Sequence, residues 1–254
     1  MTGALLVVGA VLYAAGVRRY DRAHPTRRFP RAAVAAFAGG LAVLAASLLG
    51  PVDRLAGERF AWHMAQHLLL TMVAAPLLLL GRPVGLARRA AQAPVRRAIL
   101  GVLRGRVVGA LTHPAVTWSM FAAIMWVSHF TSIYQRSLES PAVHALEHAL
   151  YLGASLLFWL PVVGTEPSRH RLGHAARLLY VFLAAAASAL LASTLVQSGR
   201  ALYPAYAGPG GLADQRTAGA VMWIAGGMLF LAAALLVAGA WARSDRVTHP
   251  RAGA

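Results

Sequence analysis

The stretch TAGAVMWIAGGMLFLAAALLVAGAW, from Thr217 to Trp241, decides the class of fold. It runs from one end to the other without a charged side chain. About 20 apolar residues in a helix are enough to cross the hydrocarbon core of a bilayer. A segment this long and this uniformly apolar is atypical of a strand or of a soluble amphipathic helix. It predicts a membrane-spanning helix.

Six further apolar blocks extend this pattern along the chain, so we expect an all-α integral membrane bundle of about seven transmembrane helices. The composition agrees, because 58% of the residues are hydrophobic and only 13% are charged, against about a quarter in soluble domains. We expect one polytopic domain over residues 1–254, with no soluble domain. The predicted blocks are Leu5–Val17, Ala32–Gly50, Phe60–Leu80, Pro114–Phe130, Pro141–Val163, Ala175–Val196 and Thr217–Trp241.

The basic residues predict the orientation of the bundle. All 24 are arginine, and the chain has only 8 acidic residues. Nineteen arginines lie in alternate connections and the C-terminal tail, and five lie in the other connections. By the positive-inside rule, the N-terminus is expected outside and the C-terminus in the cytoplasm. Because the arginines flank apolar blocks, they predict contacts with lipid head groups rather than with nucleic acid. The connection from Arg82 to Ala110 has the pattern of an amphipathic helix on the membrane surface.

The ten histidines divide into two groups. One group belongs to the inner side of the predicted topology. His113 precedes Pro114 and is expected to start a helix, and four others lie in arginine-rich segments where solvated side chains are expected: His24, His170, His174 and His249. The chain has no cysteine, so disulfides, thiolate metal sites and cysteine nucleophiles are excluded.

The second group consists of five histidines that the topology places at one depth, in the outward half of the bilayer. They are His63, His67, His129, His144 and His148. Residues four apart share a helix face, so the pairs 63/67 and 144/148 can each present two imidazoles to one point. Imidazole nitrogen suits zinc, copper, iron and nickel. The sequence therefore predicts a metal site between helices.

Other side chains qualify as auxiliary residues of this site. Glu147 lies three residues after His144, and an ionisable group inside a membrane span is by default a functional candidate. It could ligate, orient an imidazole or neutralise a cation. Gln66 is placed similarly relative to His63. Met64, Met120, Met125 and Met222 could add thioether ligands, with Met222 the best candidate, although methionine in apolar helices is usually a packing residue.

The order of motifs resembles the CtaG-type family of cytochrome c oxidase assembly proteins. The resemblance covers about residues 60–225, and the first two helices add little to it. It rests on His63-Met64-Ala65-Gln66-His67, Ala75-Pro76 running on to Gly81-Arg82-Pro83, His113-Pro114, Trp126-Val127-Ser128-His129 with Tyr134, Pro141-Ala142-Val143-His144-Ala145-Leu146-Glu147-His148, Phe158-Trp159-Leu160-Pro161, and Asp214-Gln215 with Gly219 and Met222-Trp223. Many relatives are expected to carry two prolines where this chain has Ala75-Pro76.

The resemblance implies a polytopic factor of the bacterial plasma membrane that supplies copper to the binuclear centre of the oxidase. The expected partners are the oxidase subunit that bears this centre, an extracytoplasmic copper donor and membrane lipids. Carried over residue by residue, the five histidines match those of the family, and Asp214 and Met222 match its late motif. Asp214 and Met222 would lie about two turns apart on one face of the last helix.

Three other functions stay open at this point. His144-Ala145-Leu146-Glu147-His148 matches the pattern of inverted zinc peptidases, in which the glutamate acts as general base, but no substrate groove is evident from the sequence. His67 and His148 could instead be axial ligands of haem b in an electron carrier. A scaffold that binds oxidase subunits without metal is the third alternative.

Overall fold

The computed structural model describes residues 2–248, with the side chains of 132–134, 138 and 246–248 left out of the description, and it contains helices and no strand within that range. The elements are α1 (Thr2–Ala23), α2 (Arg31–Leu49), α3 (Pro51–Glu58), α4 (Phe60–Leu68), the π-helix η1 (Leu69–Ala74), α5 (Ala75–Leu80), α6 (Pro83–Ala90), α7 (Ala93–Arg104), α8 (Arg106–Leu111), α9 (Pro114–Phe130), α10 (Ser132–Glu139), α11 (Pro141–Val163), α12 (His174–Gln197), the 3-10 turn η2 (Pro204–Tyr206) and α13 (Gly211–Thr248).

All seven predicted apolar blocks form helices, with α4, η1 and α5 together making the third. Six helical segments of the described chain are long and apolar enough to cross a membrane; the third of these continues from α4 through α6. The remaining block forms α9, which has 17 residues and is shorter than these six. The short helices α3 and α10 were not predicted, because neither has an apolar block of its own.

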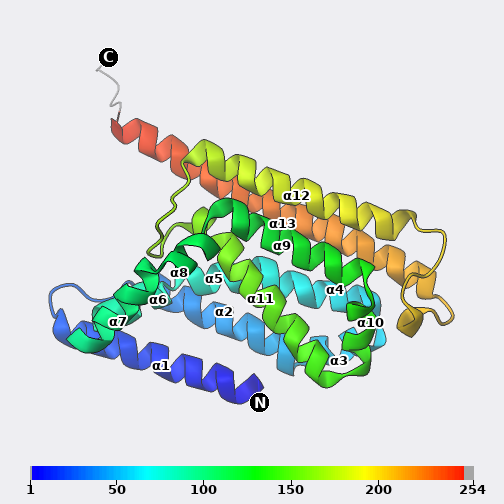
Figure 1. The fold of residues 1–254 in the computed structure, drawn as a ribbon, viewed down its shortest axis with the longest axis horizontal. Helices are drawn as coiled ribbons and strands as arrows, with labels where there is room; N and C mark the ends of the chain where they lie inside the picture. Colours follow the sequence, from blue (N-terminus) through cyan, green and yellow to red (C-terminus); the bar gives the residue numbers. More distant parts are fainter. Residues whose placement is uncertain (1, 249–254) are drawn as a thin grey trace.

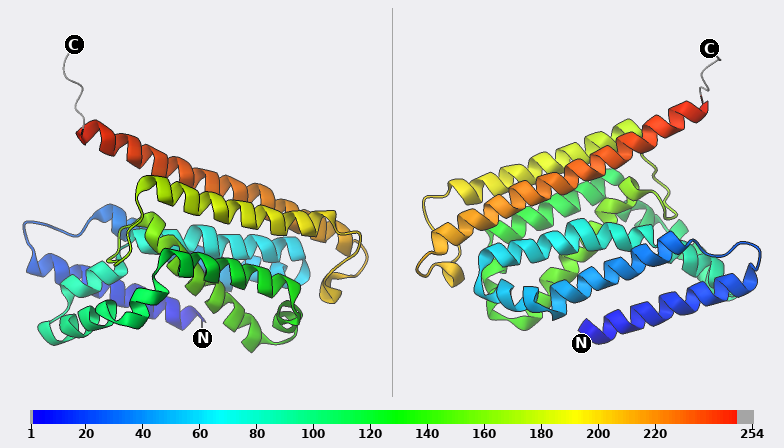
Figure 2. Two further views of the ribbon diagram at one scale, coloured as in Figure 1. Left: turned by 45° about the horizontal axis from the view of Figure 1, so that its top comes forward. Right: turned by 180° about the vertical axis from the view of Figure 1, so that it is seen from behind.

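The long helices run roughly side by side (Figure 1). α12 and α13 pack against each other along one side of the bundle, α1 lies on the opposite side, and α4, α9 and α11 lie between them (Figures 1 and 2). Aromatic side chains fill the centre, where Phe158 is fully buried and Phe230 is nearly so. Large apolar side chains such as Leu236 and Leu12 are exposed instead. An apolar outer surface of this kind is expected where the solvent is lipid.

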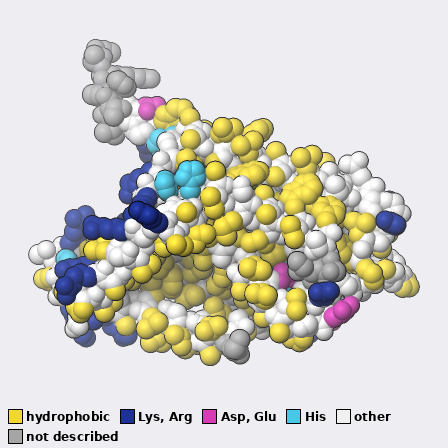
Figure 3. Space-filling model, in the orientation of Figure 1, with side chains coloured by type: hydrophobic (Ala, Val, Ile, Leu, Met, Phe, Trp, Pro, Cys, Tyr) yellow, Lys and Arg dark blue, Asp and Glu magenta, His cyan; other side chains and the backbone are white. Residues whose placement is uncertain are grey.

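The two ends of the bundle differ in charge. The connection after α1, helices α6 to α8 and the connection between α11 and α12 gather at one end, and the dark blue arginine atoms of Figure 3 cluster there. α3, α10 and the loop with η2 lie at the other end (Figure 1). The segregation of arginine that the sequence predicted is therefore present in three dimensions. Below, the arginine-poor end is called the α3–α10 end.

The connection from Arg82 to Ala110 is three short helices and not the one amphipathic helix that the sequence predicted. Pro94 lies in the first turn of α7, and Gly105 is extended between α7 and α8; proline fits the first turn of a helix but not its interior. α7 has no buried residue. Its apolar Val95 and Val102 are more than half exposed, which suits a helix lying at a membrane surface.

Glu166, in the connection between α11 and α12, fixes the start of α6. Its two carboxyl oxygens accept hydrogen bonds from the backbone N–H groups of Val84 at 2.9 Å and Gly85 at 2.7 Å. Negative charge is favourable at a helix N-terminus, but burial is the larger effect and raises the pKa of this carboxyl above its ordinary value. A Cβ at position 85 would lie 3.3 Å from Glu166 Oε2, so glycine lets the two segments approach.

The π-helix η1 interrupts the third helix and begins at Leu69, two residues after His67. Pro76 lies in the first turn of α5, and proline removes a backbone donor and collides with the carbonyl four residues earlier. A wider turn ahead of it relieves this collision. The Thr71 hydroxyl donates to His67 O at 2.7 Å, and Trp159 Nε1 donates to Thr71 O at 2.8 Å. The turn is thereby tied to α11, and π-turns are frequent at functional sites.

Candidate metal centre

Helices α4 and α11 bring two histidine pairs face to face. Within α4 the ring centroids of His63 and His67 are 4.3 Å apart, and within α11 those of His144 and His148 are 4.2 Å apart. Across the interface the His63 ring lies 5.6 Å from His144, and the His67 ring lies 5.7 Å from His148. The convergence that the spacing predicted for these four residues is present. We call these four side chains the histidine cluster.

Glu147 joins the cluster from α11. Its Oε2 atom lies 4.0 Å from His63 Nε2. One ligand atom from each of His63, His67 and Glu147 lies within 4.8 Å of the others, and all three side chains are buried. Ser137 of α10 lies next to the carboxyl group. Two nitrogens and one oxygen thus surround a point where an ion would fit.

Buried nitrogens of the cluster lack hydrogen-bond partners. Neither ring nitrogen of His67 has one within the part of the chain that the structure describes, and the same holds for Nε2 of His144 and of His148. His67 is only 5% exposed. Leaving a buried polar group unsatisfied costs about 1–3 kcal/mol, so these atoms carry an energetic cost that a bound cation would relieve.

His129 and Met222 lie at a neighbouring place. Both are buried and line a small cavity together with His67. His129 Nδ1 lies 2.6 Å from Met125 O, and its Nε2 lies 3.4 Å from Met64 Sδ. The predicted five-histidine site is therefore arranged as the histidine cluster and, beside it, a cavity that His67 shares.

Gln66 has its amide engaged elsewhere. Its Nε2 donates to Ser47 O at 2.8 Å and to Asp53 Oδ1 at 2.9 Å. These bonds tie α4 to the end of α2 and to α3. Gln66 therefore joins three helices. Its spacing from His63 suggested an auxiliary ligand, but its amide nitrogen bonds Ser47 and Asp53 instead of pointing to the cluster.

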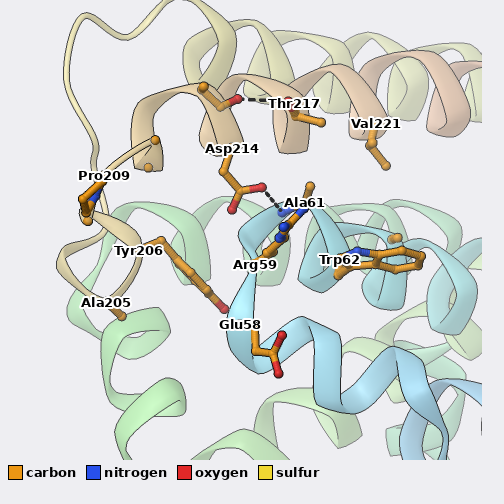
Figure 4. A pocket seen from close by; sticks show the side chains of 15 residues that line it. Glu58, Arg59, Ala61, Trp62, Ala205, Tyr206, Pro209, Asp214, Thr217 and Val221 are labelled. Atoms are coloured by element: carbon orange, nitrogen blue, oxygen red, sulfur yellow. Dashed lines mark hydrogen bonds between the residues drawn. The ribbon is translucent and has the colours of Figure 1, made fainter.

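Asp214 acts on the backbone of α4. Its Oδ2 accepts from Phe60 N at 2.7 Å and its Oδ1 from Ala61 N at 3.4 Å. Figure 4 shows this carboxylate reaching from the start of α13 to the start of α4, at the edge of an open pocket of about 770 Å³ at the α3–α10 end. The carboxylate satisfies helix donors that would otherwise lack a partner, and so it positions the helix that bears His63 and His67.

Two tyrosines near the site were missed from the sequence. The Tyr151 ring stacks on His67 with centroids 4.2 Å apart, and its hydroxyl is 2.6 Å from Ser128 Oγ. Tyr151 follows Glu147 by four residues, so the same helical spacing could have found it. Tyr203 donates to His129 O at 3.1 Å, and burial raises its pKa, which keeps the hydroxyl protonated. It lies in a loop, where no periodicity signals its position.

The structure confirms the prediction for some of the remaining histidines and corrects it for others. His113 accepts a hydrogen bond from Ala115 N at the start of α9, as expected for a helix-start residue. His24 is exposed. The prediction of solvated side chains is wrong for His170, which bonds Gly109 O at 3.1 Å, and for His174, whose ring stacks on Trp241. Both segments fold back against neighbouring helices. His249 lies outside the described residues.

Comparison with known proteins identifies relatives over most of the chain. Residues 11–244 match the family described as cytochrome c oxidase caa3 assembly factor. An uncharacterized protein of Mycobacterium leprae is 26% identical over 96% of this chain, and uncharacterized proteins of Mycobacterium bovis and Mycobacterium tuberculosis are each 27% identical over 97% of it. The chain spans 39% of the length of these relatives. No solved structure matches. The resemblance inferred from the motifs is confirmed, and the chain belongs to the cytochrome c oxidase caa3 assembly factor family.

Proposed function

We propose that this chain binds copper at the histidine cluster and delivers it to the binuclear centre of a cytochrome c oxidase. Membership of an oxidase assembly family supports the destination. In this proposal copper is cargo, which the protein accepts from an extracytoplasmic donor and passes to the oxidase subunit that bears the centre.

The observation that carries the proposal is the convergence of His63, His67 and Glu147 inside an apolar bundle. Partnerless buried nitrogens at His67 and His148 support it, because the unprotonated nitrogen of a neutral imidazole is satisfied only by a cation or a hydrogen-bond donor. With no cysteine in the chain, imidazole is the strongest donor available. Imidazole sites favour copper over other divalent first-row metals, and the Glu147 carboxylate can offset the charge of the ion.

The proposal also includes an orientation. We infer seven spans, with α9 as the seventh, in a bacterial plasma membrane. The arginine-rich end would face the cytoplasm and the α3–α10 end would face outward. His63 and His144 lie in the first turns of α4 and α11 at the α3–α10 end. The cluster would then lie near the outward face, on the side from which a donor outside the cell would approach.

The haem b alternative fits this arrangement less well. A porphyrin would have to lie between His67 and His148, whose ring centroids are 5.7 Å apart. The His63 ring and the Tyr151 ring already pack against His67 at 4.3 and 4.2 Å. Both would have to move before a macrocycle could enter.

The zinc hydrolase alternative gains one observation. A groove of about 230 Å³ between α9 and α11 reaches Glu147, although none was evident from the sequence. Its walls include the exposed side chains of Val127, Leu146 and Leu150. These walls are apolar, so the groove opens toward lipid. The substitution Glu147→Gln decides whether Glu147 acts as a base or as a counter-charge.

Metal analysis of the purified protein tests the proposal. The full chain in detergent is loaded with Cu(I) without oxygen, desalted, and assayed for copper, zinc and iron, with an absorption spectrum for haem. We expect one or two copper ions per chain and no Soret band. His148→Ala should lose most of the cluster-bound copper, whereas the matched control His24→Ala, at an exposed site, should keep it. Equal copper contents in the two variants would contradict the proposal, and a metal-free protein would favour the scaffold.

A further inference from the structure

A pocket of about 370 Å³ at the arginine-rich end has a strongly basic lining. It lies between α6, the second half of α7 and the connection between α11 and α12, at the end where the dark blue atoms gather in Figure 3. Among the described residues that line it, one is acidic, Glu166, and six are arginines. The six are Arg82, Arg88, Arg89, Arg104, Arg169 and Arg171. We call this place the arginine pocket.

Glu166 does not neutralise the arginine pocket. Its two carboxyl oxygens accept hydrogen bonds from the backbone N–H groups of Val84 and Gly85, so they are already engaged at the start of α6. Arg82 and Arg88 are close enough to interact with its charge, but within the residues that the structure describes none of the six arginines forms an ion pair. Most of the positive charge of the pocket is therefore left for a ligand.

Two of the arginines have a buried donor without a partner. These are the Nε atoms of Arg82 and Arg88, which make no hydrogen bond within the described part of the chain. A buried donor that stays unsatisfied costs free energy, and a guanidinium group offers only donors, so it needs an acceptor. Phosphate oxygens suit it best, because arginine binds phosphate through two parallel N–H···O bonds. Water could accept one such bond, but it would leave the guanidinium charges unopposed.

The backbone of Arg82 is a second, independent observation. Arg82 stands directly before α6 with φ 56° and ψ 45°, and among the described residues it is the one residue other than glycine with a positive φ. A side chain with a Cβ makes this left-handed conformation costly, and glycine or asparagine is usual there. Strain of this kind concentrates at ligand clamps. An arginine at a position whose backbone favours glycine indicates that the guanidinium group itself is needed.

The rest of the lining favours a lipid over a free phosphate ion. Leu100 and Leu103 of α7 line the arginine pocket beside the arginines, and an inorganic anion has no use for apolar walls, whereas the acyl chains of a lipid do. α7 has no buried residue and exposes Val95 and Val102, as suits a helix lying at a membrane surface. Basic pockets of this kind at the end of a membrane bundle bind the head groups of anionic lipids.

We propose that the arginine pocket binds the phosphate group of an anionic phospholipid and thereby ties α6, α7 and the connection between α11 and α12 together. Arg82 and Arg88 donate to the phosphate oxygens, and Leu100 and Leu103 contact the acyl chains. No residue of the histidine cluster lines this pocket, so the inference does not depend on copper binding.

Thermal unfolding of the full chain in detergent, with phosphatidylglycerol, phosphatidylcholine or inorganic phosphate added, tests the ligand class. A ligand that binds only the folded state raises Tm, and phosphatidylglycerol at about 100 times its Kd should raise it by about 5–10 °C. Phosphatidylcholine has a phosphate but no net charge and should raise Tm much less. An equal rise with phosphatidylcholine would overturn recognition of charge, and an equal rise with inorganic phosphate would overturn the lipid as the source.

A pair of matched variants tests the place. Arg82→Gln, Arg88→Gln removes two charges from the arginine pocket and should lose most of the rise in Tm, and native mass spectrometry should show less bound phosphatidylglycerol than for wild type. The control Arg96→Gln, Arg97→Gln removes the same charge from α7 at two exposed positions outside the pocket. It should respond to phosphatidylglycerol as wild type does.

A second pocket variant keeps the test decisive if the first fails to fold. Arg89→Gln, Arg104→Gln changes two exposed side chains of the arginine pocket and should also reduce the rise in Tm. An unchanged rise in the folded pocket variants, or an equal loss in the control Arg96→Gln, Arg97→Gln, would overturn the inference, because lipid would then bind to the surface at large. Either result would leave the proposed copper site untouched.

Discussion

The Asp214 carboxylate accepts a hydrogen bond from the backbone N–H of Phe60 at 2.7 Å, and this bond fixes the start of α4 to the start of α13. The two residues are 154 positions apart in the sequence. Because His63 and His67 follow Phe60 within two turns of the same helix, a carboxylate outside the histidine cluster sets the position of half of that cluster.

Asp214→Ala should lower the stability of the bundle. Loss of a side-chain cap at a helix N-terminus costs about 0.5–2 kcal/mol, which corresponds to a fall of about 2–4 °C in Tm for each kcal/mol in a chain of about this size. Thermal unfolding in detergent measures the change. Arg216→Ala, an exposed position two residues on, is the matched control. Equal melting temperatures for the two variants would show that the cap contributes nothing.

The orientation of the bundle can be tested with single cysteines, because the chain has none of its own. An impermeant thiol reagent applied to intact cells should label Arg136→Cys and Gly208→Cys. It should not label Arg28→Cys or Arg89→Cys until the cells are opened. All four positions are exposed in the structure, so a buried thiol does not explain a failure to react. The reverse labelling pattern would overturn the outward placement of the histidine cluster.

Copper held by the cluster should be lost as pH falls from about 7.5 to 5, because protons compete with metal for imidazole nitrogen. Dialysis at fixed free Cu(I), with copper analysis and X-ray absorption at each pH, would show loss of bound copper and of its nitrogen scattering. Retention of all copper with an unchanged spectrum at pH 5 would argue against imidazole ligation.

Glu166 should make stability depend on pH in a definite direction. Burial raises its pKa in the folded protein, so the folded state holds the proton to higher pH than the unfolded state does. Its contribution to stability is therefore full below the ordinary carboxyl value of 4.5 and is lost as pH rises through the raised value. Tm measured from pH 4 to 8 should fall less steeply in Glu166→Gln than in wild type. A steeper fall in the variant would contradict this sign.

Much of the fold could be predicted from hydropathy alone. α9 and α11 begin and end where the sequence placed them, at Pro114–Phe130 and Pro141–Val163. In both, proline marks the first turn, and it is the clearest start signal that a sequence offers. The three short helices α6 to α8 and the π-helix η1 were missed, because they depend on how Pro76, Pro94 and Gly105 bend a chain whose apolar pattern runs on through them.

The site could be predicted only up to the faces of single helices. Spacing of four residues correctly placed His63 with His67 and His144 with His148. Spacing along one helix gives no distance between helices, so the sequence did not predict the separate cavity that His129 and Met222 line. The capping role of Asp214 and the amide bonds of Gln66 also join different elements, and such contacts leave no periodic signal in a single sequence.

The role of Glu147 separates a copper chaperone from a hydrolase. If the protein carries copper, His144→Ala or His148→Ala removes a ligand and should cost most of the copper bound at the cluster. Glu147→Gln keeps the size and most of the hydrogen bonding of the side chain. The amide oxygen of glutamine can still face the ion but carries no charge, so copper binding should weaken about 10- to 100-fold, the range typical of changes around a metal site that leave its imidazole ligands in place. Assembly of active oxidase in cells should follow copper occupancy across these variants and should be partly rescued by added copper.

The hydrolase mechanism predicts a different result for the same substitution. A general base takes a proton from metal-bound water without holding the metal, so Glu147→Gln should then keep its metal fully and lose all function. Added copper would not restore function, because the variant would already hold its full amount of metal. The 4.0 Å between Glu147 Oε2 and His63 Nε2 is too long for a hydrogen bond and leaves room for an ion between them, which favours a carboxylate that acts on the metal itself. We therefore expect graded loss of copper with rescue, and full occupancy with no activity and no rescue in Glu147→Gln would rule out the chaperone.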